Sequence, residues 1–444
     1  MGRWRSSPYL WLFLVSFSLW WLGAELRGGR SLFEHDVIDQ HTLQAMAWLE
    51  GRLDLGRSPK YLEIAEYEGR YYDSFPPTPA VLELLLVPVF GRNTPNSVVL
   101  FVLVFAAQAA LFRMFRLRGF AVAGAFAAAA AFVFGTNVYV SCVKATVWAQ
   151  GQAYGFAFAV LGLSRVLDNA GRGLAGPALG YGLLSLAVGC RPFYLFMVPL
   201  FVALDWRTSG RRLPQVLGTA ALAMAPYGAL LAAHNWARFG DPLEFGHSYL
   251  PWARALPDGL FSFAYLPRNA GLAFLRLPDL TGEPPYLVFD PNGTAFWLNN
   301  GILLVALFGL LARFDGWVRA AAALSLAAIG LGVLLYASTG WRQFGFRFFI
   351  DLLPAAAVVF LHAYRRWTPA MTVALACSLA ANLYGLALTK TMTRHAAVWR
   401  YLPDREPEPS LAAQRDDRID RRGAPRRHVC GEQRCADPSR SSAG

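Results

Sequence analysis

Long apolar runs, separated by short breaks that contain arginine, dominate the sequence from residue 8 to residue 388. About 20 apolar residues suffice to carry a helix across the ~30 Å hydrocarbon core of a bilayer. The pattern therefore predicts about eleven membrane spans, the shorter of which would need tilt or flanking residues to complete the crossing. They cover residues 8–25, 96–113, 119–140, 147–166, 174–189, 192–205, 213–233, 296–312, 317–338, 351–364 and 369–388. The first run lacks a convincing signal-peptidase site and is interpreted as a retained span.

One further apolar run, at residues 77–91, is left out of this set. It contains Glu83 and Pro88 and is introduced by prolines 76, 77 and 79. Its fifteen residues would rise about 22 Å as a helix, which is short of the ~30 Å core. Proline suits the first turn of a helix, where the backbone N–H groups lack helical partners. We therefore expect a juxtamembrane helix over 77–90 that lies along or dips into the outer face.

The positions of the arginines support this choice. With the N-terminus inside, five inner loops are basic. In chain order, the first contains Arg113, Arg116 and Arg118, the second Arg165 and Arg172, the third Arg207, Arg211 and Arg212, the fourth Arg313 and Arg319, and the fifth Arg365 and Arg366. A full span at 77–91 would move all five loops outside, against the positive-inside rule. Only the segment after Leu388, which begins with basic residues, argues the other way. The sequence thus predicts a multi-pass protein of the plasma (inner) membrane with a cytoplasmic N-terminus.

The composition agrees with an all-α polytopic membrane protein, because 55% of the residues are hydrophobic and 16% are charged, against roughly 25% charged in soluble domains. The net charge of +12 is explained by the inner loops, so no nucleic-acid partner is predicted. Five cysteines show no disulfide framework. We expect one transmembrane domain over residues 1–390, with outer loops at 26–95 and 234–295. Residues 391–444 read as a polar, disordered tail.

Acidic residues gather in the two long outer loops. The first loop contains Glu34, Asp36, Asp39, Glu50, Asp54, Glu63, Glu66, Glu68 and Asp73, whereas the inner loops contain only Asp168, Asp205 and Asp315. A transporter usually carries ionisable residues within its spans, near the middle of the bilayer. The predicted spans are nearly free of them. Any chemistry is therefore expected at the outer face.

Four basic residues lie in short outer loops, where the positive-inside rule predicts few: Lys144, Arg191, Arg342 and Arg347. Each can be explained by a salt bridge or by a side chain that reaches the lipid headgroups. They can also be explained together, as ligands of one anion at the membrane surface. A lipid phosphate fits, since the forked guanidinium of arginine donates two hydrogen bonds to it at once.

An amphipathic helix is predicted at residues 40–49, with Leu43, Met46 and Ala47 on one side. Asp39 precedes it and could cap its N-terminus. Asp36 has no equally simple local explanation, and a carboxylate that faces a basic cluster suits a general base. The histidines at 35, 41 and 247 lack the spacing of metal ligands, so no metal is predicted.

Four longer motifs carry a family resemblance: "QAMAWLEGRLDL" at 44–55, "GRYYDSFPPTPAVLELLLVP" at 69–88, "NWARFGDPLEFGHSY" at 235–249 and "GWRQFGFRFFIDLLP" at 340–354. With the order of the spans, they make residues 8–390 similar to bacterial members of the GT-C superfamily. These are integral-membrane glycosyltransferases related to the dolichyl-phosphate-mannose–protein mannosyltransferases and to the aminoarabinose transferase of lipid A.

The resemblance implies a hexosyl- or pentosyltransferase of the cell envelope. Its donor would be a polyprenyl-phosphate sugar, and its acceptor would be a hydroxyl group of a protein, lipid or glycan. The transfer would invert the configuration at the anomeric carbon. The family's catalytic Asp maps onto Asp36; many relatives have an acidic pair there, but Val37 follows here, so Glu34 or Asp39 could supply the second carboxylate. Arg342 and Arg347, then Arg191 and Lys144, would bind the phosphate. No cofactor is implied, because the lipid-linked sugar is itself a substrate.

The resemblance also places Tyr71, Tyr72 and Phe75, together with His247, beside the substrate. The alternative is that the aromatic side chains belong to the interfacial belt of a membrane protein. Two other functions stay open. One is a transporter or lipid flippase, and the other is an inactive membrane scaffold with a GT-C fold, which the missing acidic pair would allow.

Overall fold

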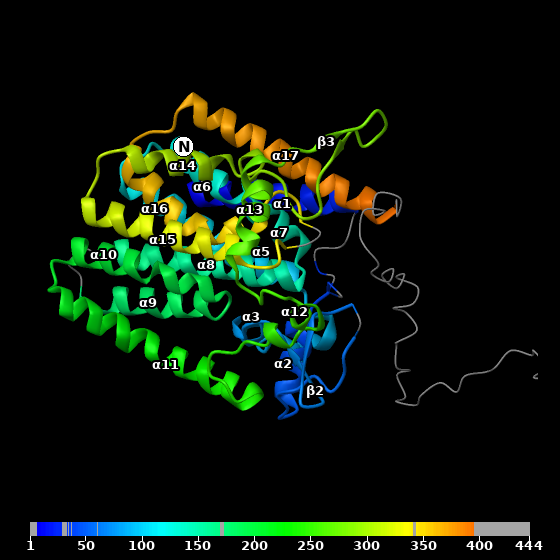
Figure 1. The fold of residues 1–444 in the computed structure, drawn as a ribbon. Helices are drawn as coiled ribbons and strands as arrows, with labels where there is room; N and C mark the ends of the chain where they lie inside the picture. The colour runs from blue at the N-terminus through cyan, green and yellow to red at the C-terminus, as the bar shows by residue number, and fades with distance from the viewer. Residues whose placement is uncertain are drawn as a thin grey trace, which may run out of the picture. The chain divides into compact units, whose positions relative to one another are not determined.

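The computed structural model describes residues 7–28, 33, 35, 36, 38–59, 61–168, 173–340 and 343–394, with side chains up to residue 388. Helices make up most of this part of the chain (Figure 1). The α-helices are α1 Pro8–Arg27, α2 His41–Leu49, α3 Thr78–Glu83, α4 Val87–Phe90, α5 Asn96–Leu117, α6 Val122–Val133, α7 Asn137–Lys144, α8 Val147–Asp168, α9 Ala175–Val188, α10 Val198–Ser209, α11 Leu213–Phe239, α12 Pro251–Arg254, α13 Leu266–Ala270, α14 Gly301–Phe308, α15 Gly316–Leu335, α16 Leu353–Ala363 and α17 Pro369–Arg394.

Short 3₁₀ turns connect or extend these helices: η1 Gly91–Asn93, η2 Pro192–Met197, η3 His247–Tyr249, η4 Phe263–Tyr265, η6 Phe296–Leu298, η7 Gly309–Leu311 and η8 Arg347–Leu352. A π-helical turn, η5, covers Gly271–Leu275. Two antiparallel hairpins complete the described chain. They pair β1 Ile64–Tyr67 with β2 Arg70–Asp73, and β3 Asp279–Leu280 with β4 Leu287–Val288.

The all-α, polytopic membrane character predicted from the sequence is confirmed. In the described residues, five helices are long and apolar enough to cross a membrane: α1, α5, α11, α15 and α17. The pair α6–α7 makes a sixth if it is counted as one broken span. Every predicted span coincides with helical structure, but α9 and α14 are shorter, and α8 carries Gln150 and Gln152 in its first turns. The number eleven therefore stays a prediction.

The predicted span at 119–140 is bent, which the hydropathy pattern did not indicate. Helices α6 and α7 meet at an angle of 61° across Phe134–Thr136. Thr136 begins α7 because its side-chain oxygen accepts a hydrogen bond from the backbone N–H of Val138 at 3.3 Å. The new helix ends at Lys144, so the bend determines where that lysine lies.

The core is built around α8, which is buried along most of its length and packs against α5, α7, α9 and α10 (Figure 1). Small residues permit this close approach, as they do between membrane helices generally. A Cβ atom at Gly155 would lie 2.5 Å from the ring of Tyr194, and one at Gly162 would lie 2.7 Å from the carbonyl of Gly180. Glycine at these two positions is thus required by packing.

The run at 77–91 does not cross the molecule as a single helix. It forms α3 and α4, six and four residues long, instead of the one helix expected over 77–90. Pro88 accounts for the break, because it lacks an N–H and its ring clashes with the helix preceding it. Leu85 and Val89 are 77% and 76% exposed, an apolar surface that suits a juxtamembrane position.

The first long loop forms a small unit around α2 and the β1–β2 hairpin. Ile64 faces Asp73 and Tyr67 faces Arg70, and the two-residue turn uses Glu68 and Gly69, both with positive φ. Leu43 and Ala47 of α2 pack with Leu55, Leu62 and Ile64. The predicted amphipathic helix at 40–49 is therefore present, and its apolar side covers the hairpin.

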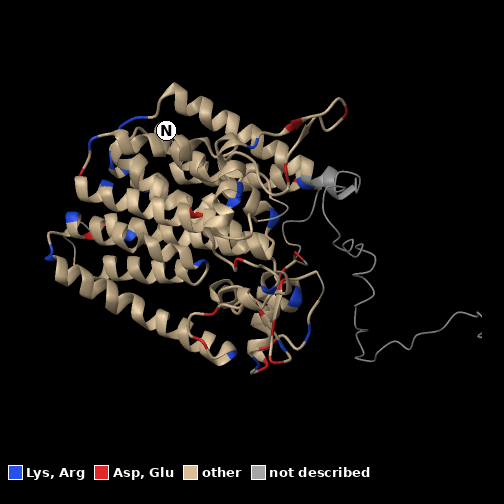
Figure 2. Cartoon of the chain, in the orientation of Figure 1, with Lys and Arg blue, Asp and Glu red and all other residues tan. Residues whose placement is uncertain are grey.

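Charged residues are segregated along the helices (Figure 2). Lys and Arg predominate at the end where α10 meets α11, whereas most Asp and Glu lie around α2, β2 and α12 and in the β3–β4 hairpin. By the positive-inside rule, the basic end near the α10–α11 connection is expected in the cytoplasm, and the acidic region around α2, β2 and α12 is expected outside.

Two matched cysteine variants test that orientation in a background whose five native cysteines are replaced by serine. Arg70→Cys and Arg212→Cys each replace an exposed arginine, one in β2 and one just before α11. We expect a membrane-impermeant maleimide to label Arg70→Cys in intact cells, and Arg212→Cys only after permeabilisation. The opposite pattern would contradict the predicted topology.

Candidate active site

Arg27 joins three segments at one end of the helices. This last residue of α1 donates from Nη1 to the carbonyls of Val143 and Lys144, at 3.0 and 2.9 Å. Its Nη2 lies 3.1 Å from Oδ2 of Asp36. The last carbonyls of a helix lack helical partners and favour a cation, so Arg27 stabilises the end of α7.

Asp36 is 4% exposed, and its other oxygen accepts from the backbone N–H of Ile38 at 3.0 Å. It does have local partners, contrary to the expectation from sequence. Arg27 itself was not singled out, because an arginine that follows a span resembles an ordinary flanking residue. Glu34, the other acidic candidate beside Asp36, lies outside the described residues.

Lys144 ends α7 next to this ion pair. Its side chain is half-buried, and no described residue forms a hydrogen bond or an ion pair with its ammonium group. The charges of Arg27 and Arg347 act unfavourably on it, and that of Asp36 acts favourably. Burial, followed by the charges of Arg27 and Arg347, lowers the pKa of Lys144 to about 7, so its ammonium form is only partly populated at neutral pH and a bound anion would favour that form.

Arg347 begins η8 and is also half-buried. Its Nε donates to the carbonyl of Gly340 at 3.3 Å, and its guanidinium lies 5.3 Å from the ring centroid of Phe348. Burial, followed by the nearby charge of Arg191, lowers the pKa of Arg347 to about 10, so it remains a cation at neutral pH. No described carboxylate forms an ion pair with it.

Arg191 belongs to the same cluster but has a partner. Its Nε lies 2.6 Å from Oδ2 of Asp351, a fully buried carboxylate. Its guanidinium also lies 4.9 Å from the centroid of Phe348. The salt-bridge explanation considered from the sequence therefore applies to Arg191, whereas Lys144 and Arg347 have no such partner among the described residues. The cation cluster is defined as Arg27, Lys144, Arg191 and Arg347.

Three of the four predicted phosphate ligands thus fall in one cluster, and the fourth, Arg342, lies outside the described residues. Gathering like charges at half-buried positions is unfavourable, and a bound anion would offset that cost. Arginine and lysine both donate charge-assisted hydrogen bonds to phosphate oxygens. In the described ranges, no three His, Cys, Asp or Glu side chains are grouped as metal ligands.

Asp39 lies in a separate, buried network that braces α2. One oxygen accepts from the backbone N–H of His41 at 3.0 Å, and the other accepts from the Thr42 hydroxyl at 2.5 Å and the Asn96 amide at 2.6 Å. Asn96 also donates to Glu83 at 3.2 Å. Burial, and then the charge of Asp39, raise the pKa of Glu83 to about 8, so Glu83 holds a proton at neutral pH. All described partners of Asp39 are structural.

The four predicted substrate-lining residues separate into two pairs. Tyr72 is 4% exposed and packs on Phe239 with centroids 5.3 Å apart, and Tyr71 packs on the apolar cluster of α2. Tyr71 therefore packs within the small unit, whereas Tyr72 packs between that unit and the end of α11. Phe75 and His247 are half-buried, with ring centroids 5.0 Å apart.

An ion pair that was not predicted ties α2 to the end of β2. Nδ1 of His41 lies 3.0 Å from Oδ2 of Asp73, and both side chains are buried. Gln40 and the backbone N–H of Phe75 donate to the other oxygen of Asp73, at 2.8 and 3.0 Å. Burial alone would lower the pKa of His41, but Asp73 outweighs it and the net pKa is raised. Burial would raise the pKa of Asp73, but His41 outweighs it and the net pKa is lowered.

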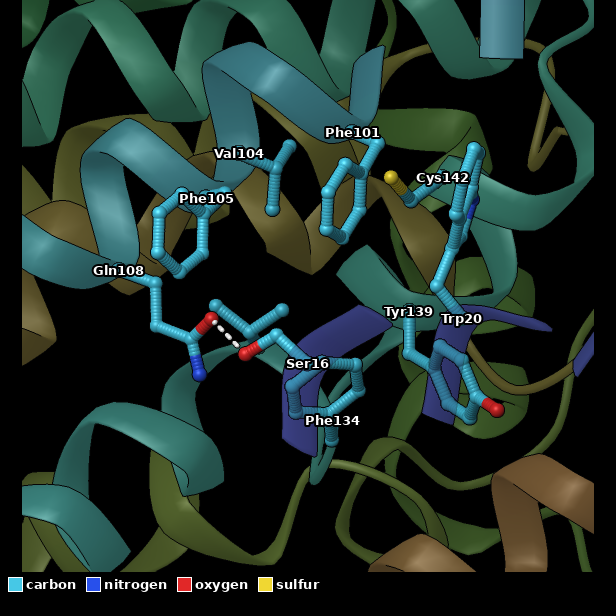
Figure 3. Close-up of a pocket in the computed structure, with 10 residues that line it drawn as sticks. Ser16, Trp20, Phe101, Val104, Phe105, Gln108, Phe134, Tyr139 and Cys142 are labelled. Carbon is cyan, nitrogen blue, oxygen red and sulfur yellow. Dashed lines mark hydrogen bonds between the residues drawn. The ribbon is translucent and has the colours of Figure 1, made fainter. Parts of the chain in front are cut away.

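A small pocket between α1, α5 and α7 lies among apolar side chains (Figure 3). Ser16 donates to Oε1 of Gln108 at 2.7 Å, and the rings of Trp20, Phe101 and Phe105 line the space. None of the predicted site residues lines it. We interpret it as a packing feature between helices.

Fold and site together define a multi-pass α-helical membrane protein with a half-buried cation cluster next to an acidic loop. Neither a protein-family model nor a curated protein matches the chain. Among solved structures it is similar to ArnT from Cupriavidus metallidurans bound to undecaprenyl phosphate, with 14% identity and a TM-score of 0.47. The apo state of the same protein gives 13% and 0.48. Each match covers 82% of this chain and 61% of ArnT, so the chain spans less than two thirds of that protein's length.

The His41–Asp73 pair predicts a pH dependence of stability. Because the pKa of His41 is raised in the folded state, His41 contributes fully to the free energy of unfolding below its unfolded pKa of about 6.5. This contribution is lost as the pH rises through the higher folded pKa. Because the pKa of Asp73 is lowered in the folded state, Asp73 contributes fully to the free energy of unfolding above its unfolded pKa of about 3.9. This contribution is lost as the pH falls through the lower folded pKa. The pair should therefore stabilise most between about pH 4 and pH 6.5.

A double-mutant cycle with His41→Gln and Asp73→Asn, followed by unfolding in detergent, measures this. We expect Asp73→Asn alone to cost about 3 kcal/mol at pH 6, as for breaking a buried pair, and the coupling between the two sites to shrink at pH 9. The partly exposed pair Arg52–Asp54, with side chains 41% and 25% exposed, provides the control, since Asp54→Asn should cost less than about 1 kcal/mol. Coupling that is equal at both pH values would contradict the assignment.

Proposed function

We propose that this chain is a membrane glycosyltransferase that moves a sugar from a polyprenyl-phosphate donor to an acceptor hydroxyl. The observation that carries the proposal is the pair Lys144 and Arg347. They are half-buried basic side chains on distant segments, they act on one another electrostatically, and no described carboxylate forms an ion pair with them. Asp36 lies in the same electrostatic environment, so a carboxylate accompanies the anion site.

In this proposal the phosphate of the donor binds to Arg347 and Lys144, with Arg191 and Arg342 beside them. The same groups act on the transition state. As the bond between the anomeric carbon and the phosphate oxygen breaks, negative charge develops on the leaving phosphate. Fixed cations in a partly dehydrated site stabilise that charge more than water would.

Asp36 is proposed as the general base, with Glu34 and Asp39 as the alternatives. It accepts the proton of the acceptor hydroxyl while that oxygen attacks the anomeric carbon from the side opposite the phosphate, so the configuration inverts. The ion pair with Arg27 fixes one oxygen of the carboxylate.

The site is proposed to lie on the outer face of the plasma membrane, where the acidic loop is expected. The acceptor is a protein, a lipid or a glycan, and the sugar a hexose or a pentose. Phe75 and His247 remain substrate-lining candidates, while Tyr71 and Tyr72 keep that role only if the small unit opens. No cofactor is required, because the lipid-linked sugar supplies the leaving group.

The test uses membranes from a strain that lacks the gene and is complemented with wild type or variants. We expect wild type to convert a polyprenyl-phosphate sugar to free polyprenyl phosphate, as followed by mass spectrometry. Asp36→Asn should lower that rate at least about a hundredfold, the usual contribution of a general base, without changing the unfolding temperature. Asp54→Asn, in the same loop, should behave as wild type.

Two results would count against this proposal. Normal turnover by Asp36→Asn, together with a folded but inactive Asp39→Asn, would move the base to Asp39. Movement of the lipid across the bilayer by wild type, with no release of free polyprenyl phosphate, would indicate a flippase instead.

A further inference from the structure

Glu63 is held at its backbone in the acidic loop. It immediately precedes β1, and its carbonyl accepts from the Gln40 side chain at 2.8 Å and from the Ser74 hydroxyl at 2.7 Å. These donors belong to the residue before α2 and to the residue after β2. The backbone at Glu63 is thus fixed by both parts of the small unit, so its side chain projects from a defined point.

The carboxylate of Glu63 has one oxygen bound and one available. Its Oε2 accepts from the indole Nε1 of Trp148 at 2.7 Å, a contact between segments 85 residues apart. Trp148 lies in the first turn of α8, four residues after Lys144. Both Glu63 and Trp148 are half-buried, and no described residue donates to Oε1 of Glu63. The indole therefore orients the carboxylate without using all of its acceptor capacity.

A row of aromatic rings leads from this region to the cation cluster. Ring centroids are 5.0 Å apart for Phe75 and His247, 6.5 Å for His247 and Tyr336, and 6.2 Å for Tyr336 and Phe348. The guanidinium of Arg347 lies 5.3 Å from the centroid of Phe348. Phe75, His247 and Tyr336 are half-buried, so each also has a side that neighbouring residues do not cover.

The negative charge of Glu63 acts on residues of this row and on the cluster itself. It interacts electrostatically with His247, Tyr336 and Arg347, which come from three other segments. The tyrosine hydroxyl has no hydrogen-bond partner in the part of the chain that the structure describes. An open carboxylate oxygen, a free hydroxyl and several ring faces therefore adjoin the proposed phosphate site.

We infer that Glu63 binds the hydroxyl groups of the sugar that is transferred, with Tyr336 and His247 beside it. This inference rests on the proposed function, because it takes the phosphate to lie at Arg347 and Lys144. An ionised carboxylate only accepts hydrogen bonds and repels phosphate. The group next to it must therefore be a donor, and the sugar hydroxyls are the donors attached to that phosphate.

The assignment makes Glu63 a specificity-determining residue. Hydrogen bonds from hydroxyls to a carboxylate are charge-assisted and strong, and aromatic rings provide apolar faces for the C–H groups of a sugar. A site built to bind a hydroxyl discriminates strongly against ligands that lack it, because its acceptor is then left unpaired. Asp39 is a poorer candidate, since both of its oxygens already accept from α2 or from Asn96.

The experiment is native mass spectrometry of the purified full-length protein, incubated with a total lipid extract of the source cells. The mass of each complex reports whether bare or sugar-loaded polyprenyl phosphate is bound. We expect Glu63→Gln to bind bare polyprenyl phosphate as wild type does, and to lower the ratio of sugar-loaded to bare complexes roughly tenfold. Glu66→Gln, an exposed glutamate in β1, is the matched control and should leave the ratio unchanged.

Arg347→Ala separates the phosphate site from the sugar site, since it should weaken both kinds of complex. An unchanged ratio in Glu63→Gln, with both ligands bound by wild type and lost in Arg347→Ala, would overturn the inference and leave the proposed function standing. Failure of wild type to bind any polyprenyl phosphate would contradict the proposed function, and the sugar site with it.

Discussion

The electrostatic cost of gathering basic side chains at half-buried positions determines the arrangement of the residues around the cation cluster. Two unit charges 4 Å apart interact by about 4 kcal/mol at the effective dielectric of a protein surface. The fold compensates two members of the cation cluster with carboxylates, Arg27 with Asp36 and Arg191 with Asp351. For Lys144 and Arg347 no described carboxylate does the same. The positive charge that no described carboxylate compensates therefore lies on Arg347 and on the protonated form of Lys144. This arrangement suits the singly charged phosphodiester of the proposed donor, and it suits still better the more highly charged phosphate that leaves.

Two departures from regular membrane helices position those side chains. The bend between α6 and α7 sets the place of Lys144, and Arg27 secures it by bonding to the last carbonyls of α7. The break between α3 and α4 keeps residues 77–91 from forming a continuous span. Thr78 then bonds to the carbonyl of Gly189, beside the turn that carries Arg191. Irregular backbone thus brings residues from distant segments to one site.

Much of this organisation could be predicted from the sequence, because hydropathy and charge report directly on the membrane. The apolar runs predicted the helices. Lys144, Arg191 and Arg347 lie in short outer loops, where the positive-inside rule predicts few basic residues, and this exception indicated a common site. The 61° bend was not predictable, since residues 134–136 are not strongly polar and the side-chain cap of Thr136 depends on the local backbone.

Contacts between distant segments account for the rest of what was missed. Glu63 was one of ten carboxylates in its loop, and nothing within the loop indicates that it meets Trp148, 85 residues away. The pair of His41 and Asp73 likewise depends on how the hairpin folds back on α2. The substrate-lining role of Tyr71 and Tyr72 stays a prediction. Alternation along a strand does not show which side is covered, and Tyr72 packs on Phe239, from a helix far along the chain.

The central claim is that Lys144 and Arg347 form the binding site of a lipid phosphate. A structure of the full-length protein in a lipid nanodisc with undecaprenyl phosphate tests it most directly. We predict phosphate oxygens within hydrogen-bonding distance, about 2.7–3.2 Å, of the Lys144 ammonium and the Arg347 guanidinium, with Asp36 on the same side of the membrane. A phosphate bound elsewhere, with both side chains still lacking an anionic partner, would contradict the account.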